Sequence, residues 1–553
     1  MASAGGNCCN GGGNNNGSNG NNDNNGNNKC NGKLSEEVAP HPVLDQLPGV
    51  QFCVRTPPPW SLCFMLGFQH YILSLGTIVM IPSLLVPQMG GGNYHKATVI
   101  QTLLFVSGIN TLLQASFGSR LPSVVVGSHA YMVPVLSIIK RYRSITDPDE
   151  RFEQTMRGIQ GALIITAAFQ ILVGFVGIWR NVARALSPLS AVSLVTFTGL
   201  GLHFMGLPIL ANCAEVGIPT LIIMLFFCQY VPQFLKTKTP VYDRFAVLIV
   251  GAIGWTLAII LTSSGVYSTD TASFPDTCRT DRAGLITGAP WLYLPIPFQW
   301  GQPTFKAGDI FAIMAASVVS LVESTGAFIT IARYGSATPV PPSVISRGGG
   351  WLGVGILLNA MFGSVTGSTI SIENAGLVAL TKVGSRRVAQ ISALFMIVFS
   401  VLGKFGAVFA SIPLPVAAVM YCICYSYVCA AGIGLLQFCN LNSFRSKFIL
   451  GFTFFMSLSI SQYFKDYENH QKGPVNTHST WFNNMMNVFF MSHASVAVFT
   501  AVFLDCTLGR KNAATRKDTG LPWWEKFYAY GSDVRTDEFY ALPFRLNYYF
   551  PAL

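Results

Sequence analysis

A carboxylate within a strongly apolar part of the chain has the clearest chemical meaning. Glu373 begins the stretch Glu-Asn-Ala-Gly and follows a short β-branched segment at residues 368–372. Irregular backbone at membrane depth is tolerated only where protein surrounds it or where it lines a cavity. Because a carboxylate within a membrane segment usually marks a functional site, this stretch predicts a polar binding site at membrane depth.

The helix expected after this segment supplies further binding groups. A half-helix beginning at Glu373 and Asn374 offers free backbone N–H groups and the positive end of the helix dipole. A polar planar substrate could bond to these N–H groups while Glu373 accepts hydrogen bonds from ring N–H donors. Capping of the helix by either residue is the alternative. The strand-like segment before the helix favours the functional interpretation.

Other polar residues interrupt the apolar segments. Glu323 lies deep in an apolar helix, where it indicates a substrate ligand, a proton carrier or both; a structural bond to a neighbouring helix is the alternative. Gln69 and His70 either contact a substrate or connect helices, and connection is favoured. Ser128 is predicted to cap a half-helix, and His129 either stacks on a planar ligand or fills the site.

The composition places these residues in a membrane protein. The 553 residues are 51% hydrophobic and 11% charged, whereas soluble domains contain roughly 25% charged residues. The net charge of +11 is attributed to basic loops that orient the chain in a membrane rather than to nucleic-acid binding. Most of the 13 cysteines lie in apolar runs and predict no disulfide framework. Cys278 lies in a polar loop without an evident partner.

Apolar stretches near the spanning length of roughly 20 residues recur from Pro57 to about residue 507 and predict about fourteen transmembrane segments. With both termini in the cytosol, most loop arginines and lysines fall on the cytosolic side, which is the positive-inside pattern. The loop at residues 140–151 is an exception. The Asn/Gly-rich tail at residues 1–45 predicts disorder.

A weak internal repeat relates the two halves of the chain. The Phe-Gly-Ser stretch at residues 117–119 recurs at residues 362–364, and in this register Ser128 corresponds to Glu373. Paired interruptions in two halves are typical of transporter sites. We therefore expect residues 122–126 and 368–372 to form adjacent antiparallel strands, with Glu323 facing them across a pocket.

Residues Glu373 to Lys382 match in full the signature Gln/Glu/Pro-Asn-x-Gly-x-x-x-x-Thr-Arg/Lys/Gly, so the chain resembles the nucleobase–ascorbate transporter family. The Gln-His motif of that family matches residues 69–70, and its eighth-span glutamate matches Glu323. The similarity covers residues 40–553, and the end of the chain resembles the plant branch.

The resemblance implies an all-α polytopic membrane protein of fourteen spans in two inverted seven-span repeats, with short strands before spans 3 and 10. Family members are homodimers in which a core domain moves against a gate domain like an elevator. The implied segments are a cytosolic tail (1–45), core spans 1–4 (58–184), gate spans 5–7 (185–264), an extracellular loop (265–306), core spans 8–11 (307–411), gate spans 12–14 (412–508) and a cytosolic tail (509–553).

The resemblance assigns substrate binding to Glu323 and Glu373, with backbone groups near His129 and Ile372. Two departures affect substrate choice and coupling. Ala327 stands where relatives often have Asp, His or Thr, and His129 stands where an aromatic residue such as Phe is common.

The favoured function is proton-coupled symport of a nucleobase such as xanthine, uric acid or uracil, in the plasma membrane and without a cofactor or metal. Ascorbate transport is an alternative, although ascorbate-type members usually begin the signature with Pro. Glu373 suits the N–H donors of a neutral base and repels an anion. A receptor that binds a base without moving it is a third hypothesis. An enzyme is disfavoured because the sequence shows no metal cluster, nucleophile elbow or phosphate loop.

Overall fold

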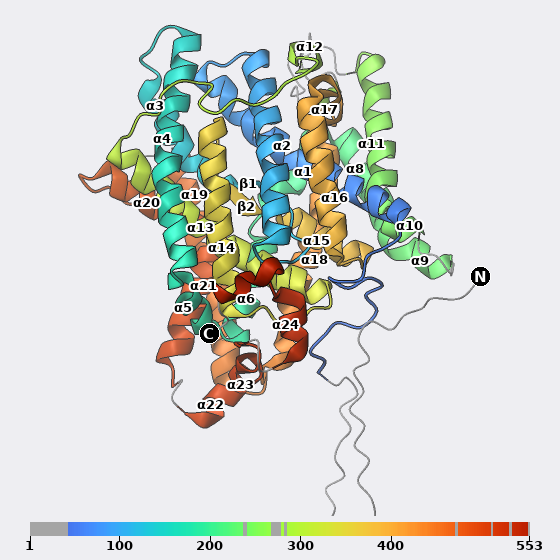
Figure 1. The fold of residues 1–553 in the computed structure, drawn as a ribbon, viewed down its shortest axis with the longest axis vertical. Coiled ribbons are helices and arrows are strands. Elements are labelled where there is room, and N and C mark those ends of the chain that lie inside the picture. Colours follow the sequence, from blue (N-terminus) through green and yellow to red (C-terminus); the bar gives the residue numbers. More distant parts are fainter. Residues whose placement is uncertain are drawn as a thin grey trace, which may run out of the picture.

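The computed structural model describes residues 43–235, 241–266, 278–280, 285–470, 474–509, 512–529 and 533–550. Almost all of the tail predicted at residues 1–45 therefore lies outside the described residues. The described chain is mostly helical and contains one two-stranded sheet (Figure 1).

The helices follow in two series that correspond to the two halves of the chain. The first series is α1 (Trp60–Met89), α2 (Asn93–Ser116), α3 (Met132–Tyr142), α4 (Pro148–Phe175), α5 (Ile178–Ala185), α6 (Pro188–Leu200), α7 (Leu207–Leu210), α8 (Ala214–Leu225), α9 (Val231–Phe234), α10 (Val241–Arg244) and α11 (Ala246–Ser263). After α12 (Leu285–Gly288), the second series is α13 (Ala307–Tyr334), α14 (Pro342–Phe362), α15 (Ile372–Thr381), α16 (Arg386–Val401), α17 (Gly403–Ala410), α18 (Leu414–Gly434), α19 (Phe444–His470), α20 (Thr480–Met491) and α21 (His493–Thr507). The C-terminal segment holds α22 (Ala513–Asp518), α23 (Leu521–Glu525) and α24 (Val534–Tyr540).

Among the described residues, seven helices are long and apolar enough to cross a membrane, or up to nine if two bent pairs each form one span. The bent pairs are α16–α17, with an angle of 112°, and α20–α21, with an angle of 83°. The number fourteen stays a prediction. Helix α4 begins at Pro148, where Asp147 caps its first turn and Pro148 presets the helical φ.

The two strands that the repeat predicts are adjacent and antiparallel. β1 (Val125–Gly127) pairs with β2 (Ser368–Ile370), and Val125 faces Ile370, which is its counterpart in the repeat register. A twofold axis between two antiparallel strands passes between two facing residues and exchanges them. Facing residues at equivalent positions, such as Val125 and Ile370, are therefore what a twofold relation between the halves requires. β1 lies further along the chain than the predicted range 122–126. Pro122 has no N–H to donate to a ladder, and the Val124 carbonyl accepts from the Ser371 N–H at 2.9 Å just before the strand begins.

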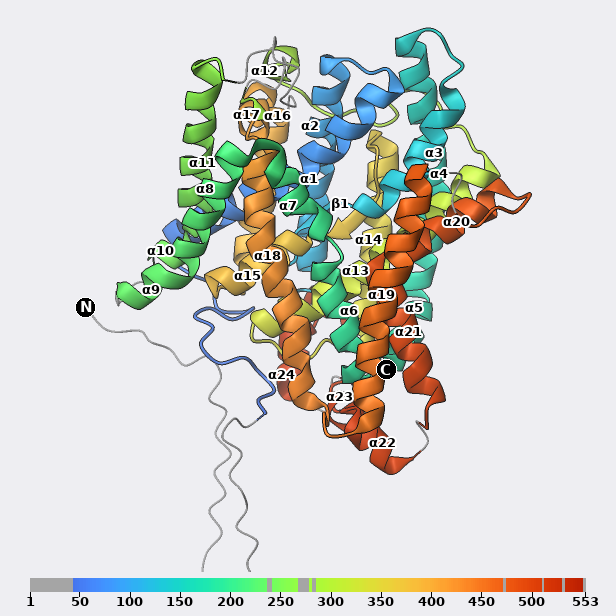
Figure 2. The same ribbon diagram turned by 180° about the vertical axis from the view of Figure 1, so that it is seen from behind.

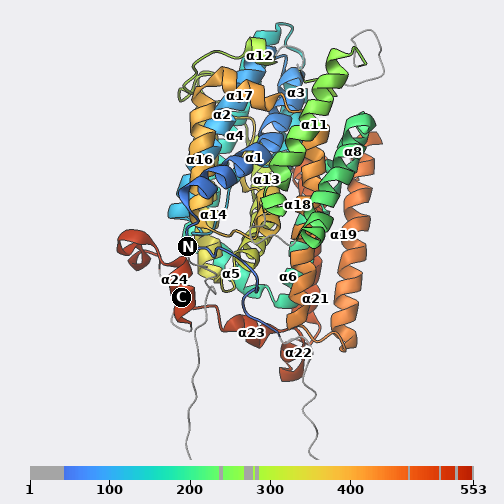
Figure 3. The same cartoon turned by 90° about the vertical axis from the view of Figure 1, so that its right-hand side faces the viewer.

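The helices pack in two groups, which Figure 3 shows from the side. In the first group, α14 packs on α4, and α16 packs on α2 and α1. In the second group, α18 contacts α6, α8 and α11, and α21 contacts α6 and α19. The short helix α15 lies against α18, where the two groups meet (Figure 2).

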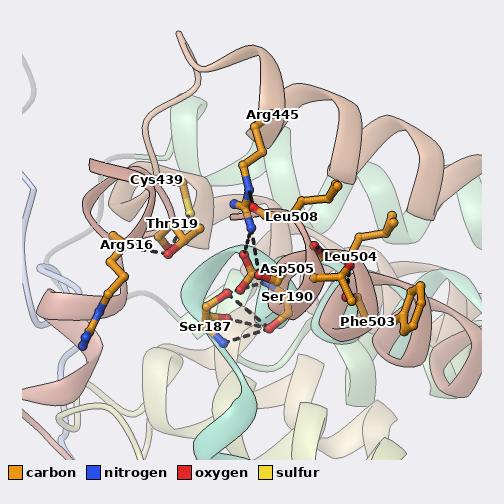
Figure 4. Close-up of polar contacts among 11 residues, drawn as sticks. Ser187, Ser190, Cys439, Arg445, Phe503, Leu504, Asp505, Leu508, Arg516 and Thr519 are labelled. Carbon is orange, nitrogen blue, oxygen red and sulfur yellow. Dashed lines mark hydrogen bonds and ion pairs between the residues drawn. The ribbon is translucent and has the colours of Figure 1, made fainter. Parts of the chain in front are cut away.

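A buried ion pair fixes two helices of the second group. Arg445 at the start of α19 donates from Nη2 to Oδ1 of Asp505 and to its backbone carbonyl, each at 2.8 Å, close to the start of α6 (Figure 4). The Asp505 side chain is only 2% exposed. Removing one partner of a buried pair leaves an uncompensated charge, so this contact ties α21 firmly to α19.

A disulfide between Cys213 and Cys278 corrects the prediction that Cys278 has no partner. Their Cα atoms are 5.9 Å apart although the residues are separated by 65 positions. No local pattern marks this pair, because Cys213 lies at the end of an apolar stretch, where cysteine usually acts as a small hydrophobe. The bond attaches part of the loop predicted at residues 265–306 to the start of α8.

Candidate functional site

The start of α15 is capped by Ser371 rather than by Glu373 or Asn374. The Ser371 hydroxyl accepts hydrogen bonds from the backbone N–H of Asn374 at 3.1 Å and from its Nδ2 at 2.7 Å. Ile372 is thus the first helical residue, and Glu373 lies in the first turn. The predicted capping alternative is therefore wrong for Glu373, and its carboxylate takes part in contacts outside α15.

Glu373 contacts the helix pair α1 and α18 through Thr77. The Thr77 hydroxyl donates to Oε1 of Glu373 at 2.9 Å and lies 3.1 Å from the Tyr421 hydroxyl. Because Thr77 has one proton to donate, Tyr421 is the donor in the second bond. The carboxylate is 3% exposed, so it is presented to a buried polar chain that crosses from α1 to α18.

Asn374 connects α15 to α1. Its Oδ1 lies 2.7 Å from Nδ1 of His70, and its Nδ2 donates to the Ser74 hydroxyl at 2.7 Å. The amide oxygen only accepts, so the His70 Nδ1 carries the proton. This bond agrees with the favoured interpretation of His70 as a connection between helices. Gln69 is fully buried, and its amide atoms have no hydrogen-bond partner among the described residues.

We expect Asn374→Ala to destabilise the protein. The substitution leaves the buried Nδ1–H of His70 without its acceptor, whereas Ser74 keeps its bond to the His70 carbonyl at 2.8 Å. An unsatisfied buried group costs roughly 1–3 kcal/mol. The melting temperature of the purified protein should fall clearly. As a control, Asn442→Ala alters an exposed turn and should change it little. An unaltered melting temperature in Asn374→Ala would contradict the role of this amide.

Glu323 lies beside β2 but makes its hydrogen bond elsewhere. Ser324, the next residue, bonds Thr369 at 3.0 Å and accepts from the Ile370 backbone N–H at 3.2 Å. Glu323 itself accepts from the Ser492 hydroxyl at 3.2 Å, at the bend between α20 and α21. Glu323 therefore joins the strand region to the second helix group.

The segment between β1 and α3 also begins with a serine cap. Ser128 caps the 3-10 turn at His129–Tyr131 by accepting from the Ala130 N–H at 3.3 Å, as predicted. This turn packs on α13, the helix that carries Glu323. Both ring nitrogens of His129 are buried and lack a partner within the part of the chain that the structure describes. Such groups suit a polar ligand better than an apolar filler.

Thr77, Tyr421 and Tyr425 were not predicted from the sequence. Tyr425 is buried, its hydroxyl has no partner among the described residues, and the charges of Glu323 and Glu373 both act on it. Thr77 lies seven residues after His70, so helical spacing places both on one face of α1. The two tyrosines are four residues apart in an apolar run, which gave no sign of a polar role.

Comparison with known proteins identifies relatives of this chain. Residues 62–466 match the sequence profile of a family described as "Permease family". "Nucleobase-ascorbate transporter 7" of Arabidopsis thaliana is 58% identical over 93% of this chain and 96% of that protein. "Nucleobase-ascorbate transporter LPE1" of Zea mays is 52% identical over 94% of this chain and 99% of that protein.

Two similar solved structures share little sequence with this chain. The transmembrane domain of the cyanobacterial bicarbonate transporter BicA has a TM-score of 0.39 and 13% identity, covering 80% of this chain and 96% of that chain. The structure of SLC26A9 has a TM-score of 0.43 and 12% identity, covering 82% of this chain and 66% of that chain.

Proposed function

Because the chain belongs to the permease family, in its plant nucleobase–ascorbate transporter branch, we propose that this membrane transporter carries a nucleobase together with a proton. The substrate class is xanthine, uric acid or uracil. The observation that carries this proposal is the buried Glu373 carboxylate in the first turn of α15, beside the strand pair that joins the two halves.

The chemistry of the proposed site suits a planar, neutral ring. Glu373 accepts from ring N–H donors, and backbone groups near His129 and Ile372 bond the ring edge. His129 and Tyr425 are buried polar groups with no partner among the described residues, so a substrate carbonyl or ring nitrogen can satisfy them. The side-chain amide of Gln69 in α1 is a further buried polar group with no partner among the described residues.

We assign the first helix group to a core domain (58–184 and 307–411) and the second to a gate domain (185–264 and 412–508). The core carries the substrate and slides against the gate like an elevator. The packing supports this division, because α14 and α16 pack on helices of the first half of the core, whereas α6 and α21 pack together within the gate. Homodimers in the plasma membrane with cytosolic termini complete the proposal.

We expect Glu323→Gln to reduce accumulation of substrate against a gradient to background, while exchange of substrate is affected less. Burying an ionised carboxylate is costly, and its bond to Ser492 places Glu323 where core and gate meet. Glutamine keeps the size and one acceptor oxygen but cannot carry a proton. Accumulation and counterflow are compared in cells or vesicles at equal surface expression. Glu215→Gln, an exposed glutamate of α8, is the control.

A panel of labelled substrates tests the function as a whole. Uptake of xanthine, uric acid, uracil and ascorbate is measured with and without a protonophore. The proposal expects uptake of at least one base that collapses with the protonophore. Concentrative uptake that survives the protonophore contradicts proton coupling. Uptake of ascorbate alone favours the alternative substrate, and binding of a base without uptake favours a receptor.

A further inference from the structure

A cavity away from the proposed substrate site is lined by arginines. It measures about 510 Å³ and lies between the segment before α1, the end of α2, the start of α16 and the segment after α24. Arg55, Arg120, Arg386 and Arg387 line it, and none of the described residues in its lining is acidic. We call this cavity the arginine pocket.

The positive charges of the arginine pocket act on one another. The charges of Arg55, Arg120 and Arg347 all bear on Arg386. Arg386 and Arg387 also occupy the first turn of α16, where the helix dipole is positive and no acidic side chain is present. Cations at this end of a helix are unfavourable, so an anion in the pocket would relieve both effects.

Arg386 and Arg387 both contact neutral groups. Arg386 donates to the backbone carbonyls of Arg120 at 2.7 Å and Phe539 at 3.0 Å. Arg387 lies over the Trp60 ring, 4.6 Å from its centroid. Arg55 pairs with Glu538 at 2.7 Å, but both side chains are more than half exposed. An exposed pair is weak and leaves Arg55 available to a stronger acceptor.

Two exposed aromatic side chains beside the pocket suit a boundary between membrane and water. Trp60 begins α1 and is 60% exposed, and tryptophans are enriched where membrane and water meet. Phe544, at the rim of the pocket, is 87% exposed and offers an apolar surface next to the charges. A cavity of this volume also falls within the roughly 300–1,000 Å³ of small-molecule sites, which exceeds the needs of a bare phosphate ion.

We propose that the arginine pocket binds a phosphate group carried by an anionic phospholipid, with an inositol phosphate headgroup as the fitting class. Basic pockets beside transmembrane helices on one membrane face bind such headgroups. Arg120 and Arg386 donate to the backbone carbonyls of Ala541 and Phe539 in the C-terminal segment. A headgroup bound by these two arginines therefore connects the end of α2 and the start of α16 to that segment.

The test uses the purified full-length protein with a short-chain phosphatidylinositol phosphate, phosphatidylcholine or inorganic phosphate. Arg55→Gln with Arg387→Gln removes two rim charges and spares the buried bonds of Arg386. At about fivefold per arginine, affinity for the inositol lipid should fall roughly 30-fold. Lys140→Gln with Arg143→Gln removes two exposed charges at the end of α3, which lies far from α24 (Figure 1), and should leave the affinity unchanged.

Binding is followed by native mass spectrometry and by the rise in melting temperature. Stabilisation by the inositol lipid but not by phosphatidylcholine supports the proposal. Stabilisation by inorganic phosphate alone supports a phosphate site but overturns a lipid as its source. No preference for the anionic lipid, or equal loss in both double variants, overturns the proposal. Should the rim variant fold poorly, competition between inositol phosphate and the lipid on the unmodified protein decides the question.

Discussion

Glu373→Gln is expected to weaken nucleobase binding at least tenfold. The glutamine keeps the size of the side chain, but it replaces one acceptor oxygen with a donor and removes the charge. A hydrogen bond to a charged group contributes roughly 1.5–3 kcal/mol, and 1.4 kcal/mol is a factor of ten in affinity. The dissociation constant of the purified protein for the transported base is measured by calorimetry or by competition with a labelled base.

The structure makes this substitution a clean test. Thr77 donates to Oε1 of Glu373, and the amide oxygen of glutamine accepts the same bond. The fold at the start of α15 should therefore persist, and a melting curve close to that of the unmodified protein verifies this. Glu525→Gln, in the C-terminal segment and partly exposed, is the matched control and should bind normally. Unchanged affinity in Glu373→Gln would remove Glu373 from the proposed site.

The repeat in the sequence predicted the arrangement of the strands better than their limits. The register that matches Ser128 to Glu373 also matches Val125 to Ile370, and these two residues face each other in the sheet. Strand limits depend on individual N–H and C=O partners, which a short β-branched stretch does not specify. The residue that caps α15 differs from the expected one for the same reason. The Ser371 hydroxyl reaches the Asn374 N–H, whereas the side chain of Glu373, two residues later, does not.

Polar contacts between residues far apart in the chain could not be predicted from the sequence. The hydroxyl of Tyr421 reaches Thr77 across 344 residues, and nothing in the apolar run of α18 marks this tyrosine as polar in role. The bend of 83° between α20 and α21 also lacks a proline or glycine signal, since Ser492 alone caps the second helix. Side-chain partners that meet only through tertiary packing leave no local pattern.

Glycines let helices of the two groups approach closely near the proposed site. A Cβ on Gly376 of α15 would lie 2.1 Å from the backbone oxygen of Cys424 in α18. A Cβ on Gly76 of α1 would lie 2.1 Å from the Tyr421 hydroxyl, and one on Gly326 of α13 would lie 2.2 Å from Thr198 Oγ1. Backbone cannot move aside as a flexible side chain can, so Gly376 has the least room of these three glycines.

Gly376→Ala should therefore reduce uptake at least about tenfold. Overpacking costs typically 1–3 kcal/mol, and the clash here is with backbone on the helix that α15 must pass if the core slides. The new methyl group forces α15 away from α18 and displaces the adjacent Glu373 and Asn374. Uptake per molecule at the membrane surface and the melting temperature are both measured, and both should fall.

Gly451→Ala in α19 is the matched control. It makes the same change within a helix, but no atom lies within 4 Å of the added Cβ. Alanine is also the better helix former by up to about 1 kcal/mol, so this variant should transport normally and be at least as stable. If Gly376→Ala behaved like Gly451→Ala, the close contact between α15 and α18 would not limit transport. That result would count against a transport cycle in which the proposed core slides along α18.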